Sequence, residues 1–417
     1  MSEVRSGGDG SEPVPLLAPR EGLPPLIEQA NDLAAAARAI EAGTGPLALD
    51  AERASAYRYS ARAYLIQLRR AGSGTFLIDP IPLRGSFAPL ATVINPLEWV
   101  LHAADQDLPG LAELGLTPTA LFDTELASRL AGLERVGLAA ISESLLGFTL
   151  AKGHGAADWS SRPLPSSWLN YAALDVEILL DLREALDQEL AEQGKREWAA
   201  EEFEFVRTRP ALPPSPERWR RTANIHTIRD KRGLATAREL WFTRDMVAEQ
   251  EDIAPKRILP DSAIVAAAAR RPRTAADLRT VPGFGGPRQR RRARVWLDAV
   301  ERARTLPGSQ LPPLRAPADS TARGAARPRP GTDAANRLSA VRKELAVVSD
   351  EVSVPVENLL APDLVRRLCA SPPEPATSDS LMQALKEGEA RPWQIALAVQ
   401  PLVTALSAPV SAYEKDA

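Results

Sequence analysis

The sequence predicts an α/β domain followed by two all-helical modules. Segments with the alternation or the short apolar length of strands come first along the chain. From residue 218 onward only helical patterns occur, and proline-rich stretches separate the regions as linkers do. The predicted parts are a disordered tail over 1–21, the α/β domain over 22–207, a linker over 208–225, a helical module over 226–306, a linker over 307–334 and a second helical module over 335–411.

Four strands are expected in the α/β domain. After a helical pattern over 23–42, the apolar segment 46–52 predicts a short buried strand. Residues 63–70 and 75–80 alternate like two antiparallel strands, joined by a tight turn of glycine and serine. Residues 98–103 predict the fourth strand.

Helical patterns dominate the rest of this domain. One helix is expected from about Leu108, helical spacing continues over 124–148, and a long helix is expected over 166–193. Residues 151–165 are rich in Gly, Ser and Pro and predict a loop before the long helix. Strands with helices packed around them are typical of an α/β domain.

Charge is distributed unevenly along the chain. The 417 residues carry 51 basic and 54 acidic side chains, for a net charge of −3. The stretch Arg218–Arg304 has 21 Lys and Arg against 10 Asp and Glu, a local net charge of +11, so the remainder carries −14. A cationic block in an acidic chain indicates a polyanionic partner, although a charge run is also typical of a solvated face.

Composition excludes several kinds of site and location. The single cysteine, Cys369, rules out an internal disulfide and a cysteine-based zinc site. The three histidines are too scattered for a histidine-rich metal site. No apolar stretch approaches the ~20 residues of a membrane span, so a cytoplasmic protein is expected. The sequence contains no clear pattern for oligomerisation.

Three acidic motifs are candidates for a functional site. Asp50 and Glu52 are two residues apart at the end of an apolar strand, so both face the same side. Asp107 follows an apolar run and opens a helix. Tyr171 and Asp175 are four residues apart and lie one above the other on a helix. Carboxylates gathered on one face repel one another unless cations such as Mg²⁺ bind to them.

Each motif also has an ordinary structural explanation. A solvated strand end accounts for Asp50 and Glu52. Asp107 is a candidate helix N-cap, and the neighbouring Asp105 competes with it for either role. Asp175 lies beside a strongly apolar run, where a buried charge needs a partner, but a surface position explains it equally well. Taken singly, the motifs leave these alternatives open.

Taken in order, the three motifs resemble the DEDD superfamily of 3′→5′ exonucleases, in the subclass with tyrosine in the last motif. The segments VLHAADQDL, DWSSRPL after Lys152, and LNYAALDVEILL resemble ribonuclease D, and the likeness covers roughly residues 25–205. Ala51 stands where threonine is common in the family, and Trp168 stands where glutamine is frequent. Neither departure falls on an expected ligand.

The resemblance implies a ribonuclease H-like fold, in which helices flank a mixed sheet, and two-metal phosphodiester hydrolysis. Two divalent ions, Mg²⁺ or Mn²⁺, are then expected ~3.5–4 Å apart at the scissile phosphate. It implies that Asp50 bridges both ions and that Glu52 and Asp175 bind on the side of the nucleophile. Asp107 is implied to act on the second ion largely through water, and Tyr171 to orient the attacking water.

The loop before the last motif contributes further candidates. Lys152 and Arg162 are candidates for contacts with backbone phosphates of the nucleic acid. Trp159 is expected in the core, and His102 is expected to be a packed histidine rather than a metal ligand.

The cationic module carries motifs of its own. Its glycine-rich turn, VPGFGG, lets backbone amides approach a phosphate, and RQRRRAR follows at once. Phe284 and Trp241 are the obvious aromatic residues near this charge, so electrostatic attraction is expected to dominate. APKRILPDSAI, the run Pro272–Leu278 and VPGFG resemble the HRDC domain. The resemblance implies nucleic-acid contacts from four arginines, Arg288, Arg290, Arg291 and Arg292.

The second helical module pairs an apolar helix with a proline-marked start, as the first one does, which suggests a diverged repeat. It resembles a degenerate second HRDC domain, because it lacks the glycine-rich turn and the arginine cluster.

These inferences predict a metal-dependent 3′→5′ exoribonuclease that trims the 3′ ends of tRNA precursors or other structured RNA. Nothing in the sequence identifies a group that recognises a 2′-hydroxyl, so an exonuclease acting on single-stranded DNA is an alternative. A nucleic-acid-binding protein with an inactive nuclease fold is a second alternative. The presence of all four carboxylates and Tyr171 disfavours it.

Overall fold

The computed structural model describes residues 12–151, 153–210, 215–315 and 328–407. The chain divides into two compact units. The first unit comprises Met1–Arg53, Arg62–Ala211 and Ala326–Ala417, and the second comprises Ala54–Ala61 and Leu212–Ala325. No helix in the described segments is long and apolar enough to cross a membrane.

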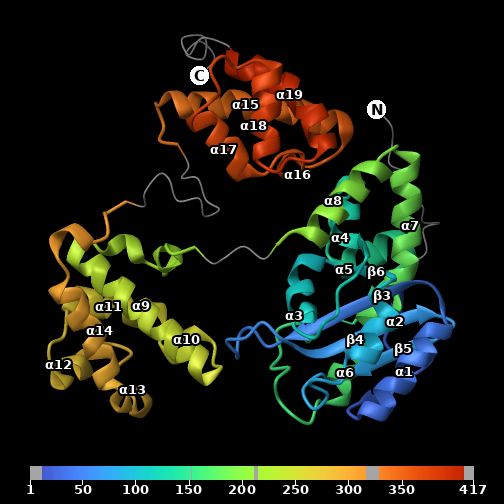
Figure 1. The fold of residues 1–417 in the computed structure, drawn as a ribbon, viewed down its shortest axis with the longest axis horizontal. Helices are drawn as coiled ribbons and strands as arrows, with labels where there is room; N and C mark the ends of the chain where they lie inside the picture. Colours follow the sequence, from blue (N-terminus) through green and yellow to red (C-terminus); the bar gives the residue numbers. More distant parts are fainter. Residues whose placement is uncertain (1–11, 152, 211–214, 316–327, 408–417) are drawn as a thin grey trace. The chain divides into compact units, whose positions relative to one another are not determined.

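A six-stranded mixed sheet forms the centre of the first unit (Figure 1). Its strands are β2 (Leu26–Ile27), β3 (Thr44–Arg53), β4 (Ala63–Ala71), β5 (Gly74–Ile78), β6 (Glu98–Leu101) and β7 (Ala120–Asp123). They lie in the order β2-β5-β4-β3-β6-β7. β3 pairs antiparallel with β4 and parallel with β6, which confirms the predicted mixed sheet. Leu47, Ala48 and Leu49 of β3 are completely buried, as expected for a central strand covered on both faces.

Helices flank this sheet. They are α1 (Ala30–Ala42), α2 (Ala88–Ile94), α3 (Leu108–Ala112), α4 (Thr124–Leu130), α5 (Leu138–Ile141), α6 (Ser166–Glu177), α7 (Leu179–Glu192) and α8 (Arg196–Thr208). α1 packs against α2, while α6 and α7 both contact β3. The predicted helix over 166–193 is therefore two helices that meet at Ile178.

Two other predicted helices are shorter than expected. The predicted helix over 23–42 begins only at Ala30, because Pro24 and Pro25 favour extended backbone and the short strand β2 follows them. The segment 124–148 contains α4, α5 and a π-helical turn over Ser142–Leu146 rather than one continuous helix.

A disordered tail was predicted over residues 1–21. Residues 1–11 lie outside the described residues, and for residues 12–21 the prediction was wrong. β1 (Val14–Leu16) pairs in parallel with β8 (Phe148–Leu150) in a separate two-stranded sheet. Pairing with a strand so far along the chain cannot be read from local composition.

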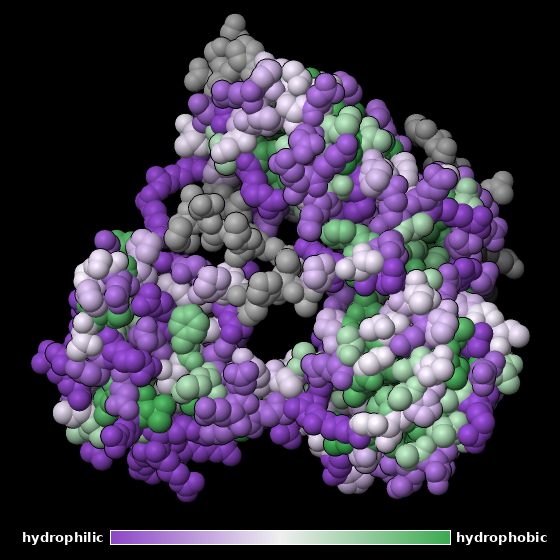
Figure 2. Space-filling model, in the orientation of Figure 1, coloured by the Kyte–Doolittle hydropathy of each residue, from purple (hydrophilic) through white to green (hydrophobic). Residues whose placement is uncertain are grey.

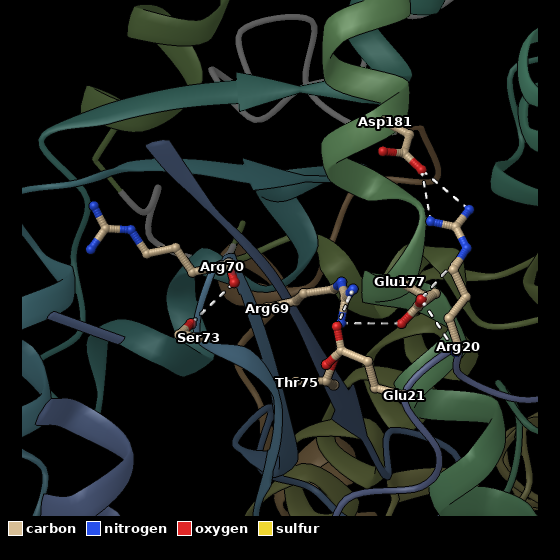
Figure 3. A network of polar contacts seen from close by, with 8 residues as sticks. All are labelled: Arg20, Glu21, Arg69, Arg70, Ser73, Thr75, Glu177 and Asp181. Carbon is tan, nitrogen blue, oxygen red and sulfur yellow. Dashed lines mark hydrogen bonds and ion pairs between the residues drawn. The ribbon is translucent and has the colours of Figure 1, made fainter. Parts of the chain in front are cut away.

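A network of charged side chains continues this N-terminal segment (Figure 3). Arg20 pairs with Asp181 of α7 at 3.2 Å, and Glu21 pairs with Arg69 of β4 at 3.4 Å. Arg69 also lies 3.3 Å from Glu177, whose side chain is fully buried at the end of α6. The N-terminal segment is thus tied to the helix that carries Tyr171 and Asp175.

The second unit is a helical module. Its elements are η3 (Arg218–Arg221), η4 (Ile225–Thr227), α9 (Lys231–Glu251), α10 (Pro255–Ile258), α11 (Asp261–Arg270), α12 (Ala275–Thr280), α13 (Pro287–Arg291) and α14 (Ala293–Thr305). Trp219 is completely buried in its core. The predicted linker over 208–225 therefore ends earlier than expected, because η3 belongs to this module. Hydrophilic residues cover most of the face of this unit that Figure 2 shows.

The last helical module belongs to the first unit. It consists of α15 (Asp333–Val352), α16 (Val356–Leu359), α17 (Pro362–Ala370), α18 (Ser378–Glu387) and α19 (Pro392–Ser407). Trp393 stacks on Trp198 of α8 with ring centres 5.1 Å apart, and its indole N–H donates to Glu202 at 2.9 Å. These contacts join the module to the core built around the sheet.

The two helical modules follow the same order of helices. α9 and α15 each end at a left-handed residue, Asp252 and Ser353. A four-residue helix comes next in both, and a later helix starts at a capping box on Thr274 or Thr377. This correspondence supports the predicted repeat.

Candidate active site

Strand β3 carries the first two candidate ligands. Asp50 lies opposite Gln67 and Glu52 lies opposite Leu65 of β4, so both carboxylates are on the same face of the sheet. Glu52 is only 8% exposed because β3 is central. The strand therefore fixes two carboxylates side by side, as the Asp-x-Glu spacing predicts.

Helix α6 brings a third carboxylate to the same place. Tyr171 and Asp175 lie one turn apart, and the Tyr171 hydroxyl donates a hydrogen bond to the Asp175 carboxylate. One carboxylate oxygen each from Asp50, Glu52 and Asp175 lie within 4.8 Å of one another. Residues from a strand and from a helix more than a hundred residues later thus converge on one point.

Asp107 approaches this cluster from the turn after β6. Ala103 adopts a left-handed conformation, with φ 60° and ψ 54°, and η1 (Ala104–Gln106) follows it. Asp107 is 6% exposed, whereas Asp105 is exposed to solvent. The negative charge of Asp50 acts on Asp107, which nevertheless lies outside the close set of three carboxylates. The geometry supports Asp107 over Asp105 as the fourth acidic residue of the site.

Asp123 holds this turn in place, and the sequence analysis missed it. Its Oδ1 accepts a hydrogen bond from the Ala103 amide at 3.1 Å, and its Oδ2 accepts one from the Ala104 amide at 2.8 Å. Oδ1 also accepts from the amides of Glu125 and Leu126, in the first turn of α4. The sequence offered one hint, an aspartate before a helical pattern, which is a common N-cap arrangement.

Burial and mutual repulsion raise the pKa values of the carboxylates. Burial, followed by the charges of Asp50, Asp175 and Asp107, raises the pKa of Glu52 to about 9. Burial and Asp50 raise the pKa of Asp107 to about 8. Burial raises the pKa of Asp50 to about 6 and moves the pKa of Asp175 well above its usual range. The nearby positive charge of Arg53 lowers the pKa values of Asp50, Glu52 and Asp107, which offsets part of this rise.

The donor set suits hard divalent cations. Every candidate ligand is a carboxylate, and oxygen ligands are those that Mg²⁺ and Mn²⁺ prefer. The raised pKa values mean that the cluster cannot hold all its negative charges at neutral pH unless cations compensate them. Across the described residues, no second group of three or more His, Cys, Asp and Glu side chains comes as close together. The residues therefore fit a metal site.

The Tyr171 hydroxyl is a hydrogen-bond donor that keeps its proton in this environment. Burial, followed by the charges of Asp175, Glu52 and Asp50, raises the pKa of Tyr171 above its ordinary value, so the phenol stays protonated at neutral pH. Its ring packs edge-on to His154, with centres 5.8 Å apart. A cavity of about 460 Å³ adjoins Tyr171, with Ser166 and Asn170 of α6 in its wall.

Of the two residues predicted to contact phosphates near α6, the structure describes Arg162 but not Lys152. Arg162 donates to both carboxylate oxygens of Asp79, at 2.5 and 2.8 Å, and to the carbonyl oxygens of Trp159 and Tyr64. A phosphate would have to compete with these contacts, so phosphate binding by Arg162 stays a prediction. Trp159 is completely buried, as expected.

His102 is a packed histidine, in agreement with the sequence analysis. Its Nδ1 lies 2.9 Å from the Thr124 hydroxyl, and burial lowers its pKa to about 4. It is therefore neutral at physiological pH.

The predicted arginine cluster of the second unit is mainly open to solvent. Arg288, Arg290 and Arg291 are exposed, whereas Arg292 pairs with Glu251. Phe284 and Trp241, which the sequence suggested as aromatic neighbours of this charge, are buried in the module's core instead. The most exposed aromatic side chain among the described residues is Phe242, at 41%, and the sequence analysis did not single it out.

Three family models match the chain. Residues 25–191 match a model described as 3′-5′ exonuclease, and residues 234–300 match the HRDC domain. Residues 326–406 match a model described as 3′ to 5′ exonuclease C-terminal domain. The HRDC match does not extend to this last module, so its predicted likeness to an HRDC domain stays a prediction.

Individual relatives extend the similarity over most of the chain. Ribonuclease D of Jannaschia sp. is 31% identical over 309 residues, which cover 71% of this chain and 78% of that protein. A crystal structure of a protein from Bifidobacterium adolescentis is 36% identical, covers 95% of this chain and 100% of its own, and has a TM-score of 0.82. The crystal structure of Escherichia coli RNase D shares the fold at 24% identity, with a TM-score of 0.68 and coverage of 92% and 98%.

Proposed function

The chain belongs to the ribonuclease D family and is a 3′→5′ exoribonuclease, and we propose that Asp50, Glu52, Asp107 and Asp175 hold the divalent cations of its hydrolytic site. The convergence of carboxylate oxygens from Asp50, Glu52 and Asp175 within 4.8 Å carries this proposal. Two divalent ions, Mg²⁺ or Mn²⁺, carry four positive charges, which equal the four negative charges of the ionised carboxylates. When bound, the cations supply the positive charge that activates water and stabilises the departing 3′ oxygen.

The protein's own residues position the reactants. Asp50, on the central strand, is close enough for its charge to act on Glu52, Asp175 and Asp107. The Tyr171 hydroxyl stays protonated and donates its single proton to Asp175 one turn away, so its oxygen can accept a hydrogen bond from the attacking water and orient it. Because α6 and β3 are both packed in the core, these groups are fixed before the substrate arrives.

Structured RNA is the proposed substrate class, with tRNA precursors as the specific candidate. Escherichia coli RNase D is an exoribonuclease involved in structured RNA processing. The second unit offers three exposed arginines, Arg288, Arg290 and Arg291, on the short helix α13. Such cations bind the phosphate backbone without regard to sequence, which suits a module that retains an RNA while its 3′ end is trimmed.

Degradation of 3′-labelled RNA tests the catalytic proposal. The full chain is incubated with a tRNA precursor, single-stranded RNA or single-stranded DNA, in Mg²⁺, in Mn²⁺ or in a chelator. Asp50→Asn is expected to lose activity on every substrate, because it removes a charged ligand. Asp105→Asn is the matched control, since Asp105 is a nearby exposed aspartate, and it is expected to stay active. Equal activity of wild type and Asp50→Asn would exclude this site.

A salt titration tests the role of the arginines. Replacing Arg290 and Arg291 by alanine is expected to weaken RNA binding and to reduce the slope of log affinity against log salt by about 1.4, roughly 0.7 for each lost contact to a single strand. Arg342 and Lys343, two adjacent exposed cations of α15, provide the matched double substitution. An unchanged slope in the Arg290/Arg291 variant would mean that the arginines form only a solvated face.

A further inference from the structure

Arg53 follows Glu52 directly, and an irregularity of the sheet lies between them. Glu52 is paired with Leu65 of β4, but Arg53 is paired with Ala63, so Tyr64 is an extra residue on the partner strand. In a regular strand the side chain of Arg53 would point away from the face that carries Glu52. The extra residue is on β4, and Arg53 is the last residue of β3, with no further pair of the sheet after it. The guanidinium reaches the acidic cluster, where its Nε lies 3.4 Å from Oδ1 of Asp107.

The contacts of Arg53 hold it only loosely. Besides the ion pair with Asp107, its Nη2 donates to the side-chain oxygen of Gln106 at 3.0 Å. A separation of 3.4 Å is longer than the ~2.7–2.9 Å of a strong charge-assisted hydrogen bond. The Arg53 side chain is 28% exposed, whereas that of Asp107 is 7% exposed. With five N–H donors on a guanidinium, Arg53 can therefore take a further acceptor from the solvent side.

The chemistry of the guanidinium identifies that acceptor. Two divalent cations would neutralise the four ionised carboxylates, so Asp107 would then no longer require the charge of Arg53. A phosphodiester carries one negative charge and presents two oxygens in the geometry that a guanidinium recognises. We propose that Arg53 pairs with Asp107 in the RNA-free protein and binds a backbone phosphate at the 3′ end of the RNA in the complex. This inference rests on the proposed function, because it requires the RNA end to enter the carboxylate cluster.

A purely structural role for Arg53 makes the opposite prediction about metal binding. If Arg53 only held Asp107 in position, its removal would disorder that ligand and weaken the binding of cations. If Arg53 instead competes with cations for the carboxylates, its removal strengthens cation binding. The second outcome follows here because like charges repel and Arg53 shares the cluster with the metal.

Two substitutions in the full chain separate these roles. Arg53→Gln removes the charge, and Arg53→Lys keeps the charge but loses the planar fork. Arg183→Gln is the matched control, because Arg183 is similarly part-buried, at 22%, and pairs with Glu98 outside the site. Mn²⁺ binding to the RNA-free proteins is measured by calorimetry, and KM and kcat are measured on 3′-labelled RNA. Thermal melting verifies that each variant is folded.

The expected pattern combines tighter metal binding with weaker RNA binding. Arg53→Gln should bind Mn²⁺ about 5- to 10-fold more tightly, because a competing charge is gone. Its KM for RNA should rise about 10- to 100-fold, the range for a lost hydrogen bond to a charged group. Arg53→Lys should keep the metal affinity of the wild type and show an intermediate KM. If Arg53→Gln does not fold, the raised KM of Arg53→Lys at unchanged Mn²⁺ affinity carries the test.

Other outcomes overturn the inference in distinguishable ways. Unchanged or weaker Mn²⁺ binding by Arg53→Gln, or an unchanged KM in both variants, rejects the role of Arg53 while the wild type remains active. Failure of the wild type to bind Mn²⁺, or full activity of Asp50→Asn, rejects the proposed metal site itself and the inference with it.

Discussion

Metal binding by this protein should release protons, and the number of protons follows from the acidic cluster. With pKa values of about 9 and about 8, Glu52 and Asp107 each carry a proton at pH 7 in the metal-free protein, whereas Asp50, at about 6, is mainly ionised. Divalent cations bind the ionised carboxylates, so their binding displaces these protons. We expect the release of about two protons at pH 7, one each from Glu52 and Asp107.

The same linkage makes metal affinity depend steeply on pH. Release of two protons corresponds to a rise in affinity of about 100-fold for each pH unit near pH 7. Both the release and the slope should decline as the pH approaches the pKa of Glu52, about 9, because the carboxylates are then ionised before the metal binds.

Calorimetric titration with Mn²⁺ in buffers of different ionisation enthalpy measures this release directly. Glu52→Gln should lower the count by about one proton, because it removes the group with the higher pKa. Glu134→Gln, at an exposed glutamate, is the matched control and should leave the count unchanged. A release near zero at pH 7 would refute the reasoning, since it would mean that the cluster is already ionised or does not bind the metal.

Three other predictions concern stability and turnover. Folding raises the pKa of Glu52 from 4.5 to about 9. Between these pH values the metal-free folded protein therefore binds more protons than the unfolded chain. Its free energy of unfolding should fall as the pH rises across that window. Urea denaturation at pH 5, 7 and 9 measures this fall, which saturating Mg²⁺ should reduce; a pH-independent free energy would contradict it. Tyr171→Phe should lower kcat by about 100-fold through loss of water orientation while Mn²⁺ affinity is retained, and an unchanged kcat would remove Tyr171 from the mechanism. Trp393→Ala should cost about 3–5 kcal/mol of unfolding free energy, because the indole is 4% exposed and stacked, whereas Met382→Ala at an exposed position of the same module should cost little.

The sequence predicted the antiparallel start of the sheet well because its signals are local. β3, β4 and β5 each lie within two residues of their predicted bounds. Alternation over five or more residues and a glycine-rich turn specify such strands without help from the rest of the chain. The same locality explains why Asp50 with Glu52, and Tyr171 with Asp175, were paired correctly on a strand face and a helix face.

The elements that the sequence did not predict are short or depend on distant partners. β1, β7 and β8 have three or four residues each, too few to show a period. β1 forms only because it pairs with β8, which comes after the strands of the six-stranded sheet in the sequence. Val14 lies opposite Phe148 in this pair. The break at Ile178 interrupts a continuous apolar pattern and carries neither glycine nor proline to mark it.

Within the site, the sequence singled out carboxylates that the fold brings close together, but not how they are held. The placement of Asp107 depends on a departure from regular geometry, a left-handed Ala103 that Asp123 fixes through two backbone amides. Such departures concentrate where function overrides local preference, and residues distant in sequence impose them. Strict alternation assigns Arg53 to the opposite face of the strand from Glu52, and the sequence analysis did not single it out. The guanidinium beside Asp107 therefore belongs to a residue whose contact with the carboxylates the alternation of β3 alone does not predict.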